Sequence, residues 1–149
     1  MSLRLQYSPT PANAKALAQL AVDAARKVDS VELDYSPASL KEVDRILGVF
    51  HSEKLRADQI GETVFSFGCY VGEVMVRHLG GTWKMPQQSF WSRLGFGETN
   101  MMMVEMLNGN VWNPIGKAFK TLENGKVESL SYFYEVALNS SGKPIANLA

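Results

Sequence analysis

Residues 68–83 read GCYVGEVMVRHLGGTW, and this stretch decides how the chain folds. It contains the only cysteine of the chain and one of its two histidines. The apolar residues recur at helical spacing, and the pair Gly80-Gly81 is a natural helix end because glycine accepts the left-handed conformation. The stretch therefore predicts a helix that runs from about residue 60 to Leu79.

The helix separates the chemically active side chains into two groups. With about 100° between successive residues, most apolar side chains lie on one broad face together with His78, so we expect His78 to point toward the core. Cys69, Glu73 and Arg77 follow one another at intervals of four and form a stripe on the opposite side. Cys69, Glu73 and Arg77 are therefore one candidate site, and His78 is not part of it.

Two glycines inside this helix, Gly68 and Gly72, indicate close packing. A glycine in a helix interior costs roughly 1 kcal/mol relative to alanine. This cost is tolerated where another part of the chain must approach the backbone closely. We expect a central helix, packed by neighbours on two sides, with no room for a ligand beside the glycines.

The remaining sequence predicts a single α+β domain over residues 1–149. The apolar stripes, caps and turn residues predict about five helices and a small antiparallel sheet of about three strands. Besides the central helix, helices are expected over residues 8–28, 36–50, 113–122 and 127–138, and strands over 82–85, 87–94 and 100–107. Val28 falls on the apolar stripe of the first helix, and residues 1–8 and 139–149 are expected to be loose ends.

Composition excludes several classes of function. Fifteen basic and fifteen acidic residues cancel and interleave, whereas binders of nucleic acid or anionic membranes carry basic patches. No stretch approaches the roughly 20 apolar residues of a membrane span. A lone cysteine fits a reducing compartment, and the N-terminal residues lack a signal-peptide layout. We expect a cytoplasmic protein that binds neither nucleic acid nor a membrane.

Catalytic candidates are few. Cys69 would be a nucleophile if His51 or Arg77 activated it and solvent reached it. A free cysteine is more commonly a small buried hydrophobe, and Glu73 with Arg77 is also an ordinary i, i+4 ion pair. Cys69 and Glu73 have a metal-ligand spacing but no second cysteine or histidine nearby. The sequence therefore predicts no catalytic residue, no metal site and no cofactor.

The strongest candidate surface lies between residues 83 and 112. This segment holds all three tryptophans and five of the seven methionines, residue types that are frequent at adaptable binding surfaces. The predicted binding residues are Trp83, Trp91, Met101, Met103 and Trp112. We expect a non-catalytic binding protein, immunity-like or adaptor-like, whose partner is another protein or a second copy. The alternative is a small enzyme or small-molecule binder that uses Cys69, Glu73 and Arg77.

Four short motifs resemble bacterial domains of unknown function. They are Ser39-Leu40, GCYVGEV at 68–74, GGTW at 80–83 and Asn113-Pro114-Ile115. The resemblance covers most of the chain after residue 30, although Lys117-Ala118 replaces an expected valine. It implies a cytoplasmic bacterial protein and supplies no activity. It also implies that Gly72 and Glu73 lie beside Trp83.

Overall fold

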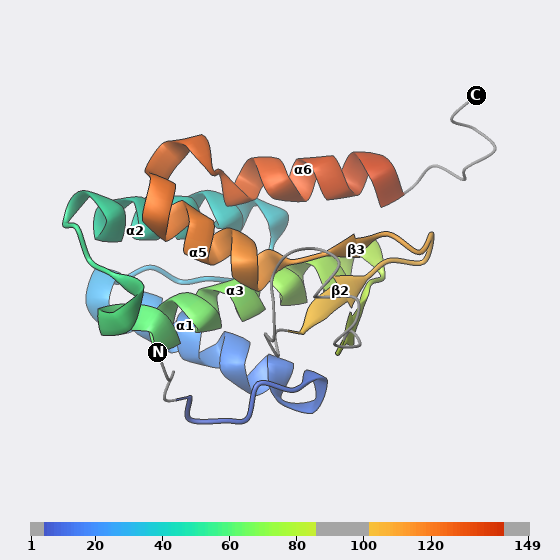
Figure 1. Cartoon of the computed structure of the whole chain (residues 1–149), viewed down its shortest axis with the longest axis horizontal. Helices are drawn as coiled ribbons and strands as arrows, with labels where there is room; N and C mark the ends of the chain where they lie inside the picture. Colours follow the sequence, from blue (N-terminus) through green and yellow to red (C-terminus); the bar gives the residue numbers. More distant parts are fainter. Residues whose placement is uncertain (1–4, 86–101, 142–149) are drawn as a thin grey trace.

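The computed structural model describes residues 5–85 and 102–141. These residues form five α-helices and a three-stranded antiparallel sheet, which is the predicted α+β class (Figure 1). The helices are α1 (Ala14–Asp29), α2 (Leu40–Ser52), α3 (Ala57–Leu79), α5 (Pro114–Asn124) and α6 (Leu130–Ser141). The strands are β1 (Thr82–Lys84), β2 (Met103–Glu105) and β3 (Val111–Trp112), in the order β1-β2-β3. Short 3-10 helices lie at Pro11–Asn13, Pro37–Ser39 and Gly125–Val127.

Several predicted boundaries need correction. The central helix begins three residues early, at Ala57, and is kinked at Ile60, whose φ of −130° is not helical. α6 continues to residue 141, so the first residues of the predicted loose end at 139–149 are helical. β3 was not predicted, because its two residues are too few to show an alternating pattern. The predicted strand over 87–94 lies outside the described residues.

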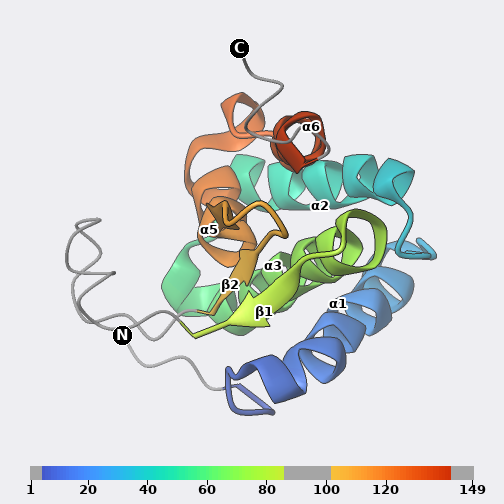
Figure 2. The same cartoon turned by 90° about the vertical axis from the view of Figure 1, so that its right-hand side faces the viewer.

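The helix α3 is the centre of the molecule. It lies between α1 and α5, while α2 and α6 form a further layer above it (Figures 1 and 2). The side chains from Val64 to Met75 are buried around the whole circumference of the helix. A helix that is apolar and buried on all sides needs neighbours on all sides, so the prediction of a central helix is confirmed.

The two glycines of α3 lie where other elements touch it. A Cβ atom on Gly68 would be 2.5 Å from the Cα of Ile115 in α5, and one on Gly72 would be 2.1 Å from the Trp83 ring on β1. Both distances are far below van der Waals contact. The predicted close approach is therefore confirmed, and its partners are a helix backbone at Gly68 and an indole at Gly72.

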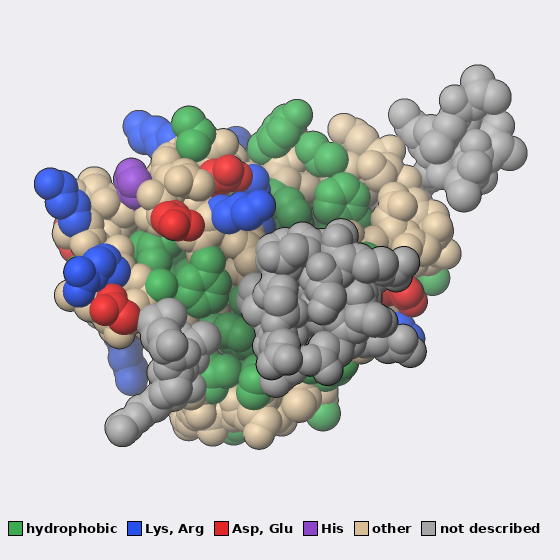
Figure 3. Space-filling model, viewed as in Figure 1, with side chains coloured by type: hydrophobic (Ala, Val, Ile, Leu, Met, Phe, Trp, Pro, Cys, Tyr) green, Lys and Arg blue, Asp and Glu red, His purple; other side chains and the backbone are tan. Residues whose placement is uncertain are grey.

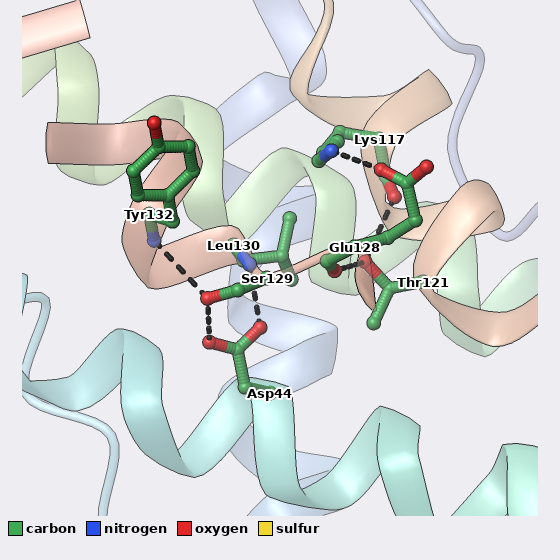
Figure 4. A network of polar contacts seen from close by, with 7 residues as sticks. All are labelled: Asp44, Lys117, Thr121, Glu128, Ser129, Leu130 and Tyr132. Atoms are coloured by element: carbon green, nitrogen blue, oxygen red, sulfur yellow. Dashed lines mark hydrogen bonds and ion pairs between the residues drawn. The ribbon is translucent and has the colours of Figure 1, made fainter. Parts of the chain in front are cut away.

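The start of α6 is capped by a residue from another helix (Figure 4). Asp44 of α2 accepts hydrogen bonds from the backbone N–H groups of Leu130 (2.6 Å) and Ser131 (3.0 Å). The hydroxyl of Ser129 also donates to Asp44 (3.0 Å) and accepts from the N–H of Tyr132 (3.1 Å). The first N–H groups of a helix have no partner within the helix, and here Asp44 and Ser129 satisfy three of them.

A second set of contacts fixes the turn before α6. Lys117 of α5 forms an ion pair with Glu128, and the hydroxyl of Thr121 is within hydrogen-bonding distance of the carbonyl oxygens of Lys117 and Glu128 (Figure 4). The Glu128 side chain is only partly exposed, and the hydrogen bond from Lys117, together with the positive charge of Lys117, holds the pKa of Glu128 below its usual value. The chain between α5 and α6 is thereby held to α5 on one side and, through Asp44, to α2 on the other.

We predict that Gly68→Ala destabilises the protein by about 1–3 kcal/mol, the usual cost of overpacking a core, because the new methyl group would collide with the Ile115 backbone. Urea denaturation measures the change in the free energy of unfolding. Gly48→Ala in α2 is the matched control, because its Cβ would meet nothing within 4 Å. The control should stabilise the protein by up to about 1 kcal/mol through helix propensity. Equal effects of the two substitutions would contradict the close-packing explanation.

Candidate functional site

Cys69 lies inside the core. Its side chain is fully buried, and burial raises the pKa of the thiol far above its usual value, with a further contribution from the charge of Glu73. The thiolate, which is the nucleophilic form, is therefore disfavoured. The structure does not place His51 beside Cys69, because the Nδ1 atom of His51 hydrogen-bonds the carbonyl oxygen of Leu122 (2.9 Å) in α5.

Glu73 is a buried carboxylate with one strong partner. The indole Nε1 of Trp83 donates to its Oε2 (2.9 Å), and only 2% of the Glu73 side chain is exposed. The other oxygen, Oε1, accepts no hydrogen bond from the described residues and lies 3.9 Å from Nε of Arg77. Gly72, Glu73 and Trp83 thus meet as the resemblance implied, and the contact joins α3 to β1.

Arg77 and its neighbour His78 hold a strained residue in the loop before α2. Tyr35 has a φ of +63°, which is unfavourable for a residue with a side chain. Its N–H donates to the hydroxyl of Tyr70 (2.8 Å), and its carbonyl oxygen accepts from Nε2 of His78 (2.9 Å). The guanidinium of Arg77 lies 3.7 Å from the centre of the Tyr35 ring. Arg77 and His78 therefore have structural partners.

The prediction that His78 points toward the core is wrong, because His78 is exposed. The fully buried part of α3 ends at Met75, and in the last turn Val76 and Leu79 are only partly buried. The His78 ring is exposed there and bonds to the loop at Tyr35.

The predicted binding residues have different surroundings. Trp83 and Met103 are buried, and Trp112 is partly buried with an Nε1 that has no hydrogen-bond partner among the described residues. Trp91 and Met101 lie outside the described residues. In the described part of this segment, the tryptophans and Met103 are thus core side chains or lie at the edge of the core.

Neither a metal cluster nor a membrane helix is found in residues 5–85 and 102–141. No three His, Cys, Asp or Glu side chains are grouped closely enough there to hold a metal ion. None of the helices described is both long enough and apolar enough to cross a bilayer.

An apolar groove between α1, α2 and α3 was not predicted. We call it the α1–α2 groove; it has a volume of about 190 Å³. It is lined by Ala24, Ala25, Val28, Asp29, Ile46, Val49, Phe50, Ile60, Thr63 and Phe67. The side chains of Ile46 and Phe67 are buried, whereas Val28 and Val49 are 77% and 41% exposed. The groove therefore has a buried apolar floor and two exposed valines on its edges.

One residue that lines the α1–α2 groove, Asp29, forms an ion pair. Asp29 at the end of α1 lies 2.5 Å from the guanidinium of Arg45 in α2, and Arg45 also pairs with Glu42 (2.8 Å). Asp29 is the single ionisable residue in the lining of the groove, and the ion pair with Arg45 offsets its charge. The groove is thus suited to an uncharged, apolar group.

A wider hollow lies beside α5 and contains His51. It has a volume of about 610 Å³ and an apolar base formed by Leu55, Ala57, Phe119 and Leu122. Figure 3 shows hydrophobic side chains on this face, with Lys and Arg side chains gathered at its left-hand end. The charged residues of the hollow, Lys54, Arg56 and Glu123, are exposed. It lacks the enclosed polar groups that orient a small molecule in a binding pocket.

Two different reasons explain why the groove could not be found from the sequence. Val28 was assigned to the buried stripe of the first helix, but it lies in the last turn of α1, after the last buried residue, Ala25. The buried stripe consists of Ala14, Leu17, Ala18, Ala21, Val22 and Ala25. Val49 lies just outside the apolar stripe of α2, and an apolar residue in that position is the one signal that could have indicated an exposed edge.

Comparisons of the chain with family models, with curated proteins and with solved structures found no match.

We predict that Cys69 reacts with iodoacetamide only after the protein unfolds, because the thiol is buried and the high pKa of the thiol leaves little thiolate. Mass spectrometry of the labelled chain, in buffer and in denaturing urea at the same neutral pH, measures both rates. The urea sample is the control for intrinsic reactivity. If the native chain is labelled at the same rate as the unfolded chain, Cys69 is accessible and reactive, and the nucleophile hypothesis is supported.

We predict that Trp83→Phe lowers the free energy of unfolding by about 2 kcal/mol or more, because the buried Glu73 carboxylate would lose its hydrogen-bond donor. Glu73→Gln provides the second arm of a double-mutant cycle in urea denaturation. Since an unpartnered amide costs less to bury than an unpartnered carboxylate, the loss of the indole should cost less in the Glu73→Gln background. Strictly additive effects would show that the two side chains are not coupled.

Proposed function

We propose that the protein is a non-catalytic binding protein that holds an apolar side chain of another protein in the α1–α2 groove. The observation that carries the proposal is the groove itself, with a buried floor at Ile46 and Phe67 and exposed edges at Val28 and Val49. Water over such a groove is released when an apolar side chain fills it, and this release favours binding.

The size of the groove favours a protein side chain over a free small molecule. Pockets for small molecules usually have about 300–1,000 Å³, whereas the α1–α2 groove has about 190 Å³. This volume suits one large apolar side chain, such as leucine, methionine or phenylalanine. Helical and extended segments present such anchors when they bind an apolar groove.

The small exposed apolar area at the α1–α2 groove argues against a second copy of the chain as the partner bound there. Each subunit of a stable dimer buries roughly 800 Å², and two valine side chains supply only a small part of that area. The compensated charges of Asp29 and Arg45 at the edge also favour an uncharged anchor. A segment of a different protein, bound through one anchor, fits these observations better.

The catalytic alternative has little support. Cys69 and Glu73 are buried, and the bond from Trp83 occupies one oxygen of Glu73. Arg77 is stacked on Tyr35. The resemblance to bacterial domains and the single cysteine support a protein of the bacterial cytoplasm. An adaptor or immunity protein acts by binding and needs no catalytic residues, so either role fits the proposal.

The experiment is a selection from a random peptide library displayed on phage, with the full chain as bait. We expect selected peptides to contain an apolar anchor and to bind Val49→Asp and Val28→Asp at least about tenfold more weakly than the unmodified chain, since loss of an anchor contact costs about 2 kcal/mol or more and about 1.4 kcal/mol corresponds to tenfold. Fluorescence anisotropy with the synthetic peptides measures the affinities.

Leu107→Asp is the matched control, because Leu107 is 89% exposed but lies between β2 and β3, outside the groove. Circular dichroism confirms that each variant is folded. Peptides that bind all three variants equally would contradict the proposal. Analytical ultracentrifugation tests the other occupant. If the chain dimerises and Val49→Asp abolishes the dimer, the groove binds a second copy of the chain and not a segment of another protein.

A further inference from the structure

A second depression adjoins the α1–α2 groove across Val49. It has a volume of about 670 Å³ and shares Val49 with the groove. It is lined by Lys41, Asp44, Arg45, Gly48, Val49, His51, Ser52, Gly125 and Lys126. We call it the basic hollow. An extended or helical segment with its anchor in the groove can thus pass directly over the basic hollow.

Two cations in the basic hollow are available for a partner. Lys41 and Lys126 are exposed, and neither forms an ion pair with any described residue. They come from different elements, the first turn of α2 and the 3-10 helix after α5. Arg45 is already paired with Asp29 and Glu42, so we do not count it as free.

The one acid in the lining of the basic hollow is already occupied. Both carboxylate oxygens of Asp44 accept hydrogen bonds from the start of α6, from the N–H groups of Leu130 and Ser131 and from the hydroxyl of Ser129 (Figure 4). These donors and the positive end of the α6 dipole offset the charge of Asp44. His51 donates through Nδ1 to the carbonyl oxygen of Leu122 and adds no negative charge. The field of the basic hollow is therefore set by its lysines.

From this juxtaposition we propose that the partner segment is acidic as well as apolar: its anchor fills the α1–α2 groove, and aspartate or glutamate side chains next to the anchor pair with Lys41 and Lys126. This inference rests on the proposed function and specifies the chemistry of the partner. Exposed ion pairs add little affinity one by one, but they select the partner and speed its association. The apolar anchor supplies affinity, and the acidic residues supply specificity.

The test uses the same phage library of random peptides and the double variant Lys41→Glu/Lys126→Glu. We expect peptides selected on the unmodified chain to be enriched in Asp and Glu beside the apolar anchor. Their affinity should fall about tenfold in the double variant, as expected when two weak attractions become repulsions. The same affinity should fall when salt is added.

The matched control is Lys15→Glu/Lys84→Glu, which changes the net charge equally. Both lysines are exposed, and neither lines the groove or the basic hollow. The control should bind the peptides with an affinity within about twofold of the unmodified chain, since distant surface charges are screened.

The outcomes separate this inference from the proposed function. Peptides that need Val49 but lack acidic residues, or that bind the Lys41→Glu/Lys126→Glu variant normally, overturn the inference and leave the groove as an apolar binding site. Equal losses in the two double variants also overturn it, because only net charge would then matter. If no selected peptide depends on Val49, the proposed function fails and the inference fails with it.

Discussion

The contact between Trp83 and the glycine–glutamate pair of α3 is the interaction on which the rest of the structure depends. The indole lies against Gly72, where no Cβ would fit, and donates its N–H to the buried carboxylate of Glu73. One side chain thus fills space and satisfies a buried polar group. At Gly68, Ile115 of α5 fills the space that a Cβ atom would occupy. Together they let α3 be covered on all sides, so that α1, α2 and α5 can surround it.

The sequence was informative where local pattern and packing agree. Gly68 and Gly72 are poor helix residues, so their presence within a strongly apolar helix indicated close neighbours, and the structure confirms them. Glycines 80 and 81 correctly marked the end of α3, where Gly80 has a φ of +78°. The α+β class and the strands β1 and β2 followed from the same kind of local signals, whereas β3 was not predicted. The partners of the glycines could not be derived, because they come from distant parts of the chain.

The sequence failed where exposure depends on neighbours. Val28 and His78 both lie at helix ends, and both were placed in the core on the basis of a helical stripe. A stripe continues to the last residue of a helix, but the covering elements end earlier, so both residues are exposed. The α1–α2 groove likewise depends on neighbours, because its lining comes from three helices, α1, α2 and α3. In the sequence patterns of the three helices, Val49 beside the apolar stripe of α2 is the one sign of it.

The cap of α6 by Asp44 has a consequence for the order in which the chain folds. Asp44 and Leu130 are 86 residues apart, so the cap is not available until α2 is in place. A helix of twelve residues is marginal on its own, and α6 has only Ser129 as a local cap. Contacts between distant residues form late, because a long loop must close first. The stability of α6 therefore depends on α2 being folded and in place beside it.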